Sequence, residues 1–245
     1  MRQVAVVTVV LLIAGGCSIP EKQLIDATVE VPPYSCLGQP LPTTAREQIT
    51  ISGALKHPSS GTNIANAVIE AFLVNEPQKV LFSMTTNADG KFTRAQGTGG
   101  APRDLFLRTA PNGYLSAYYY PAVPLSRDLT TDIQLLVSEE VAQIAGFVGV
   151  EHDPTKVVYV VTVVDCNGVP VSGATVTANP PGDVRYLANT TPSEDAIATD
   201  ATGSAFIFNV PPGNTTINAN AAGMTLRSHS LNGFAGAIMQ TDIQP

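Results

Sequence analysis

Short stretches in which apolar and polar residues alternate recur along the chain and predict β-strands. Residues 48–52, 68–74 and 104–109 carry the β-branched and alternating residues that suit a pleated surface buried on one face. Turn sequences that contain a glycine lie at residues 87–90 and 165–168. Strands spaced about 8 to 12 residues apart and joined by such turns are typical of an all-β sandwich.

Two stretches depart from this alternation. Residues 157–164 are apolar at every position except Thr162, which predicts a strand covered by its own core on one face and by a neighbouring domain on the other. Residues 138–146 carry a helical signal, because Ser138 suits an N-cap, two glutamates suit the positive end of the helix dipole, and Gly146 suits the stop. We expect a two-turn connecting helix there; the alternative is a plain loop.

The chain contains an internal duplication. Four segments of one half reappear in the other half in the same order, displaced by 107 to 113 residues. This period is too long for a solenoid repeat, so two whole domains in tandem are predicted. We place these domains at residues 48–137 and 156–245, with a connector at residues 138–155. The matching segments are residues 66–71 and 173–178, 86–90 and 199–203, 112–114 and 222–224, and 131–134 and 241–244.

The N-terminus has the pattern of a leader. A positively charged start precedes an apolar run at residues 4–14, which is too short to cross about 30 Å of hydrocarbon and predicts a signal peptide. Small residues at 14–16 stand directly before Cys17, an arrangement that resembles the lipobox of bacterial lipoproteins. The resemblance implies removal of residues 1–16 and an acylated, palmitate-bearing Cys17. In a Gram-negative host, Ser18 implies the outer membrane. An ordinary secretory leader is the alternative.

Residues 17–47 are polar and contain several prolines, and we interpret them as a tether that becomes ordered near Cys36. If Cys17 is acylated, Cys36 and Cys166 remain, and an oxidising compartment permits one disulfide between them. Such a bridge would tie the N-terminal segment to the second domain. Two free thiols are the alternative, because the sequence does not decide the geometry that a disulfide requires.

Residues 163–176 resemble the opening of carboxypeptidase regulatory-like domains, which is a strand, an Asp-x-x-Gly turn and then Pro-Val-x-Gly-Ala-x-Val. The family's later turns also have counterparts, Thr-Asp-x-x-Gly at residues 199–203 and Pro-x-Gly at residues 211–213. The resemblance covers residues 157–245 well and residues 49–137 more loosely. It implies an immunoglobulin- or transthyretin-like sandwich and an accessory role on a secreted or surface protein, more than any activity.

Charge and the distribution of histidines argue against two classes of protein. The chain has 13 Lys and Arg against 20 Asp and Glu, a net charge of −7, so we expect no nucleic-acid partner. His57, His152 and His229 are isolated along the sequence and form no zinc-ligand spacing, so we expect no metal and no cofactor. Ser228 and Ser230 flank His229, but neighbours along a strand point to opposite faces, so the tripeptide itself forms no catalytic pair.

Tyr118 and Tyr120 share one face of a predicted strand. Two exposed rings there would form a stacking platform for a sugar or a peptide side chain. The alternative is that both rings pack over the end of the sandwich or at the domain junction.

Together these patterns predict a non-enzymatic, lipid-anchored protein of the cell outer membrane, without catalytic residues, whose two sandwich domains serve binding, adhesion or scaffolding. The expected partners are the membrane, through the N-terminal lipid, and an envelope protein or polysaccharide. A carbohydrate-binding module that uses Tyr118 and Tyr120 is the second hypothesis. A hydrolase whose residues are not recognisable in the sequence is the third.

Overall fold

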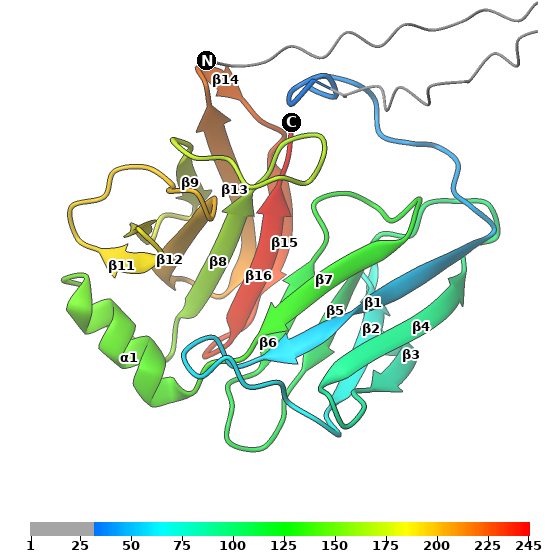
Figure 1. The fold of residues 1–245 in the computed structure, drawn as a ribbon, viewed down its shortest axis with the longest axis horizontal. Coiled ribbons are helices and arrows are strands. Elements are labelled where there is room, and N and C mark those ends of the chain that lie inside the picture. Colours follow the sequence, from blue (N-terminus) through cyan, green and yellow to red (C-terminus); the bar gives the residue numbers. More distant parts are fainter. Residues whose placement is uncertain (1–31) are drawn as a thin grey trace, which may run out of the picture. The chain divides into compact units, whose positions relative to one another are not determined.

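The computed structural model describes residues 32–245, which form sixteen strands and one helix (Figure 1). The prediction of a nearly all-β chain with one short helix is confirmed. The elements are β1 Gln48–Lys56, β2 Val68–Leu73, β3 Glu76–Thr85, β4 Lys91–Gly97, β5 Leu105–Thr109, β6 Ala117–Tyr120, β7 Leu129–Gln134, α1 Ser138–Phe147, β8 Val157–Val163, β9 Thr175–Asn179, β10 Asp183–Ala188, β11 Thr191–Ser193, β12 Ser204–Val210, β13 Gly213–Ala221, β14 Met224–Thr225, β15 His229–Gly233 and β16 Ile238–Ile243.

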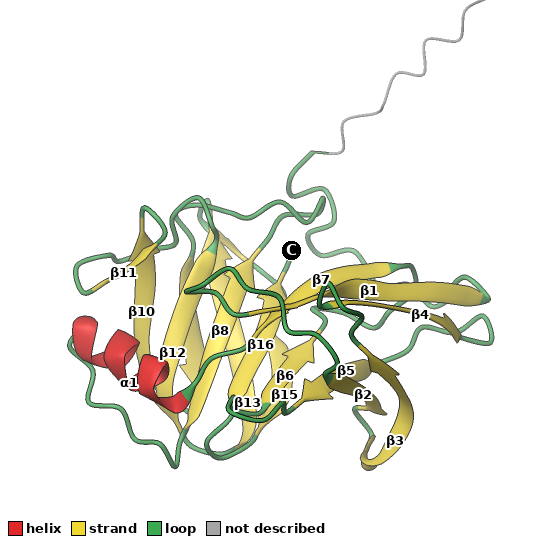
Figure 2. Cartoon of the chain, turned by 60° about the horizontal axis from the view of Figure 1, so that its bottom comes forward, coloured by secondary structure: helices red, strands yellow, loops and turns green. Residues whose placement is uncertain are grey.

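The strands of the described chain form three sheets. One contains β4, β1 and β7, and another contains β14, β13, β15 and β9. The third has nine strands in the order β11-β10-β12-β8-β16-β6-β5-β2-β3, so it draws strands from both repeats (Figure 2). Strand β7 runs parallel to β1, and β16 runs parallel to β8. Because β16 also pairs in parallel with β6, one strand joins the two repeats into a continuous sheet.

The core of the N-terminal repeat lies between the three-stranded sheet and the β6-β5-β2-β3 end of the long sheet. Ile49, Ile51 and Leu55 of β1 are fully buried there, as the alternating pattern predicts. Gly53 lies between them with φ +157°, and a Cβ at this position would be 1.6 Å from the carbonyl oxygen of Thr131 on β7. Glycine is therefore required for β7 to pair with β1 at this point.

Strand β8 is buried on both faces, as its apolar sequence predicts. Tyr159 faces the core of the C-terminal repeat, whereas Val158 and Val160 belong to a separate cluster on the other face. Helix α1 supplies Val141 and Ala145 to this cluster, one turn apart on the same side of the helix. The connecting helix folds back across the sheet and covers the second face of β8 (Figure 2). Leu136 and the partly buried Leu115, which lie in the range predicted for the neighbouring domain, belong to the same cluster.

Helix α1 begins and ends at other residues than expected. The N-cap is Val137, whose N–H donates to the Glu140 carboxylate at 3.3 Å. Gly146 lies within the helix instead of ending it. The stop comes at Val148 and is followed by Gly149 with φ +70°, a left-handed conformation that glycine adopts without strain.

Residues 32–38 lie against the C-terminal repeat. A disulfide joins Cys36 to Cys166, with the two Cα atoms 5.7 Å apart. The Cys166 N–H also donates to the carbonyl oxygen of Pro33 at 2.8 Å. The predicted signal peptide and the lipidation site Cys17 lie outside the described residues.

The described residues 32–245 all belong to one compact unit. The continuous sheet accounts for this clustering, and the division into domains at residues 48–137 and 156–245 stays a prediction. No helix within residues 32–245 combines the length and hydrophobicity needed to span a bilayer.

Candidate functional site

A carboxylic acid and a phenol meet where β16 joins the two repeats. The hydroxyl of Tyr119 on β6 donates to Oδ2 of Asp242 on β16 at 2.6 Å. Within the part of the chain that the structure describes, Oδ1 of Asp242 has no hydrogen-bond partner. The carboxylate therefore keeps unused acceptor capacity.

The duplicated sequence gives Asp242 a twin, Asp132, at the same position of the repeated residues 131–134 and 241–244. Asp132 pairs with the ammonium group of Lys56 at 2.6 Å and accepts the Ala54 N–H at 3.0 Å. Its side chain is 46% exposed. Asp242 forms no salt bridge to any cation among residues 32–245. The same motif therefore provides an acid with a cation partner in one repeat and an acid without one in the other.

Burial perturbs both members of the Tyr119–Asp242 pair. Removal from water raises the pKa of Asp242 above its ordinary value, and the hydrogen bond from Tyr119 opposes this change. Burial and the adjacent Asp242 charge both raise the pKa of Tyr119, so the phenol stays protonated and remains a donor. An acid with a raised pKa beside an open cavity marks a candidate functional site.

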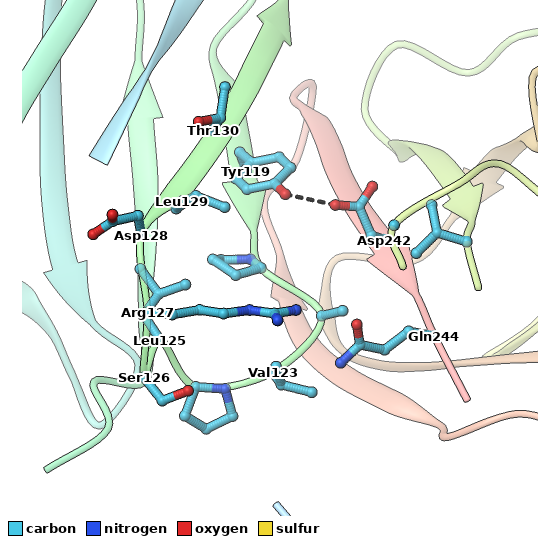
Figure 3. A pocket seen from close by; sticks show the side chains of 15 residues that line it. Tyr119, Val123, Leu125, Ser126, Arg127, Asp128, Leu129, Thr130, Asp242 and Gln244 are labelled. Carbon is cyan, nitrogen blue, oxygen red and sulfur yellow. Dashed lines mark hydrogen bonds between the residues drawn. The ribbon is translucent and has the colours of Figure 1, made fainter. Parts of the chain in front are cut away.

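Such a cavity of about 260 Å³ opens beside the pair. The loop between β6 and β7 forms one wall, and Asp242 with Gln244 forms the opposite one (Figure 3). Arg127 of that loop extends across the cavity toward Gln244 (Figure 3). Neither the Arg127 guanidinium nor the Gln244 side-chain amide has a hydrogen-bond partner among the described residues. The neighbouring Asp128 is already engaged, because it accepts from the Arg46 side chain at 3.2 Å.

Tyr118 and Tyr120 do not form the exposed platform considered from the sequence. Their exposures are 8% and 2%, and they share one face of β6 as the strand period requires. That face lies against the C-terminal repeat, where the Tyr118 ring stacks on Phe234 at 4.4 Å between centroids. The Tyr120 ring stacks on Phe106 at 4.8 Å, so a ligand cannot reach either ring face.

A second group of polar side chains was not visible in the sequence. The Nε2 of His57 lies 3.1 Å from the Glu140 carboxylate, and its Nδ1 lies 3.1 Å from the Ser60 hydroxyl. Nδ1 also accepts the Ser60 N–H at 3.3 Å, so the ring proton is on Nε2 and faces the acid. A hydroxyl, an imidazole and a carboxylate in this order are the groups found where an oriented base activates a nucleophile. The hydroxyl also accepts the Thr62 N–H at 3.2 Å, which makes it part of a local turn.

The structure brings together some of the residues that the sequence singled out. Cys36 and Cys166 are joined, whereas His152 and His229 lie apart from the junction cavity, since neither lines it. Within residues 32–245, no three His, Cys, Asp or Glu side chains lie close enough together to hold a metal ion. The junction residues Arg127 and Asp242 were not predicted; the identical repeat at residues 131–134 and 241–244 was the signal that marked this part of the chain.

No protein-family model matches the chain, and no curated protein matches it. Among solved structures, it is similar to the Bacillus anthracis TIE protein, with 16% identity and a TM-score of 0.29 over 80% of this chain. It spans only 34% of that protein. It is also similar to the shaft pilin SpaA from Lactobacillus rhamnosus GG, with 11% identity and a TM-score of 0.26 over 83% of this chain and 98% of the pilin.

An enzyme is among the similar structures as well. The 3-chlorocatechol 1,2-dioxygenase from Rhodococcus opacus 1CP has 13% identity and a TM-score of 0.28, over 43% of this chain and 68% of the enzyme. Bacterial pilins and a dioxygenase thus match at the same low level. TM-scores of this size carry no argument about function in either direction.

Proposed function

We propose that this protein is a non-enzymatic, lipid-anchored module of the cell envelope that binds a partner molecule at the junction of two tandem β-sandwich domains. Cys17 carries the lipid, and the outer membrane is the location. The two domains are of the carboxypeptidase regulatory-like type, at residues 48–137 and 156–245.

The observation that carries this proposal is the junction itself. Strand β16 pairs with both β8 and β6, so the two repeats are held in one continuous sheet. The cavity beside Asp242 lies at this join and includes polar groups without partners among the described residues. A concave site with a few convergent polar groups, held by rigid strands, is the usual form of a binding site.

The anchored N-terminal segment supports the same function. The disulfide between Cys36 and Cys166 fastens residues 32–38 to the turn that leads from β8. Gly168 of this turn lines the junction cavity. The disulfide therefore holds residues 32–38 near the cavity.

Two measurements test the proposal. Membrane fractionation should find the wild-type protein in the outer membrane and the Cys17→Ala variant in the soluble fraction; membrane retention of the variant would contradict the lipid anchor. Chemical crosslinking in intact envelopes, followed by capture of the tagged protein, should then recover a reproducible partner from wild type. Capture of nothing beyond the Cys17→Ala background would contradict the binding function.

The two residues proposed as carbohydrate contacts are not accessible to a ligand. The rings of Tyr118 and Tyr120 are inside the fold, and no other feature of the described residues favours an extended glycan. The same capture experiment addresses this hypothesis, since recovery of polysaccharide without protein would favour it over a protein partner.

A further inference from the structure

The junction cavity offers two opposite charges to a ligand at the same time. Asp242 stands on β16 at one wall, and Arg127 stands on the loop between β6 and β7 at the other (Figure 3). The Asp242 carboxylate has one free oxygen, and the Arg127 guanidinium has no partner among residues 32–245. No salt bridge joins the two groups, so both charges are available to a ligand.

A larger hollow on the outer face of β1 allows a comparison, because its acid already has a cation as a partner. That hollow, of about 640 Å³, contains Asp132, the twin of Asp242. Lys56 lines the same hollow and already neutralises Asp132 at 2.6 Å. Among residues 32–245, Asp242 has no such cation, and a ligand with a cationic group would supply one.

The cavity's size limits the ligand. A volume of about 260 Å³ is below the range of roughly 300–1,000 Å³ that accommodates drug-sized molecules. Only a small molecule, or one terminal group of a larger partner, fits inside it. A small molecule with a cationic and an anionic group a few bonds apart fits both the volume and the two charges.

We propose that the junction cavity binds the zwitterionic head of a small α-amino acid, with the ammonium group on Asp242 and the carboxylate on Arg127. The guanidinium fork suits a carboxylate because it donates two parallel hydrogen bonds. The Gln244 amide also lines the cavity and can donate to the ligand's carboxylate or accept from its ammonium group. The inference rests on the proposed binding function and specifies the ligand of that site.

Isothermal titration calorimetry on the purified full-length protein tests this inference. Alanine is the probe, and propionate and n-propylamine are half-ligands that each lack one charge. We expect alanine to bind at least about tenfold more tightly than either half-ligand, since hydrogen bonds to charged groups are the strong ones. Equal binding of the three compounds, or no binding of alanine, would overturn the proposal.

Three variants locate the site. Asp242→Asn and Arg127→Gln should each weaken alanine binding by about tenfold or more, and Asp132→Asn, the matched change in the other repeat, should leave it unchanged. Arg127 is exposed, so we expect Arg127→Gln to fold. This variant therefore tests the site even if Asp242→Asn does not fold. Unchanged affinity of Arg127→Gln would overturn the assignment. If alanine fails to bind while envelope capture still recovers a partner, only this ligand is wrong and the binding function stands.

Discussion

Acidification should destabilise this fold through His229, a partly buried histidine on β15. Its Nδ1 lies 2.8 Å from the Thr241 hydroxyl, which donates its own proton to the carbonyl oxygen of Tyr120 at 2.9 Å. Because the hydroxyl has a single proton, the imidazole must donate through Nδ1. Burial lowers the pKa of His229 from 6.5 to about 4, so the ring is neutral in the folded protein at physiological pH.

The sign and size of the effect follow from proton linkage. Between pH 6.5 and about 4 the unfolded chain binds a proton at His229 that the folded protein does not bind, so the free energy of unfolding falls as the pH falls through this window. A pKa change from 6.5 to about 4 corresponds to about 3 kcal/mol. Below about pH 4 both states are protonated at this residue and the loss from it is complete.

Urea unfolding of wild type and His229→Gln at several pH values between 7 and 4 measures this contribution. Glutamine can still donate to Thr241 but does not titrate, so the variant should lose less stability than wild type over the window, by about 3 kcal/mol. The comparison also removes the opposite contribution of Asp242, which is present in both proteins. Identical pH dependences for the two proteins would refute a His229 that is neutral in the folded protein.

Three further predictions concern the disulfide, the junction acid and catalysis. Replacing Cys36 and Cys166 by serine opens a loop of 130 residues and should lower the free energy of unfolding by up to about 5 kcal/mol in urea titrations; an unchanged midpoint would contradict the bridge. Burial raises the pKa of Asp242 above the ordinary 3.8, so its ionisation lowers stability as the pH rises from there; Asp242→Asn should therefore melt no lower than wild type at pH 7, and a clearly lower melting temperature would contradict this sign. A fluorophosphonate probe should leave the protein unlabelled, whereas labelling that Ser60→Ala abolishes and Ser59→Ala preserves would contradict a non-enzymatic function.

Local patterns predicted the strands because each depends on neighbours a few residues away. The alternation at Ile49 and Ile51 and the apolar run of β8, interrupted only at Thr162, both correspond to observed burial. The pairing of β16 with β6 was not predictable, because it joins residues more than one hundred positions apart and depends on how the two repeats pack. The same pairing explains why the division into separate domains is less evident in space than in the sequence.

The candidate site depends on the same long-range packing. Asp132 and Asp242 occur in identical tetrapeptides, so no sequence rule distinguishes the surface ion pair from the junction acid. The strand period correctly placed Tyr118 and Tyr120 on one face, but whether that face meets water or the other repeat was decided by the fold. His57 looked isolated because its partner Glu140 lies on the connecting helix.

The central claim is that a partner binds at the junction cavity, and matched capture experiments test it most directly. Wild-type protein, Asp242→Asn and Asp132→Asn are crosslinked in intact envelopes and captured in parallel, with the partner quantified for each. We predict equal recovery for wild type and Asp132→Asn and a loss of about tenfold for Asp242→Asn. Equal recovery by all three proteins would contradict binding at the junction.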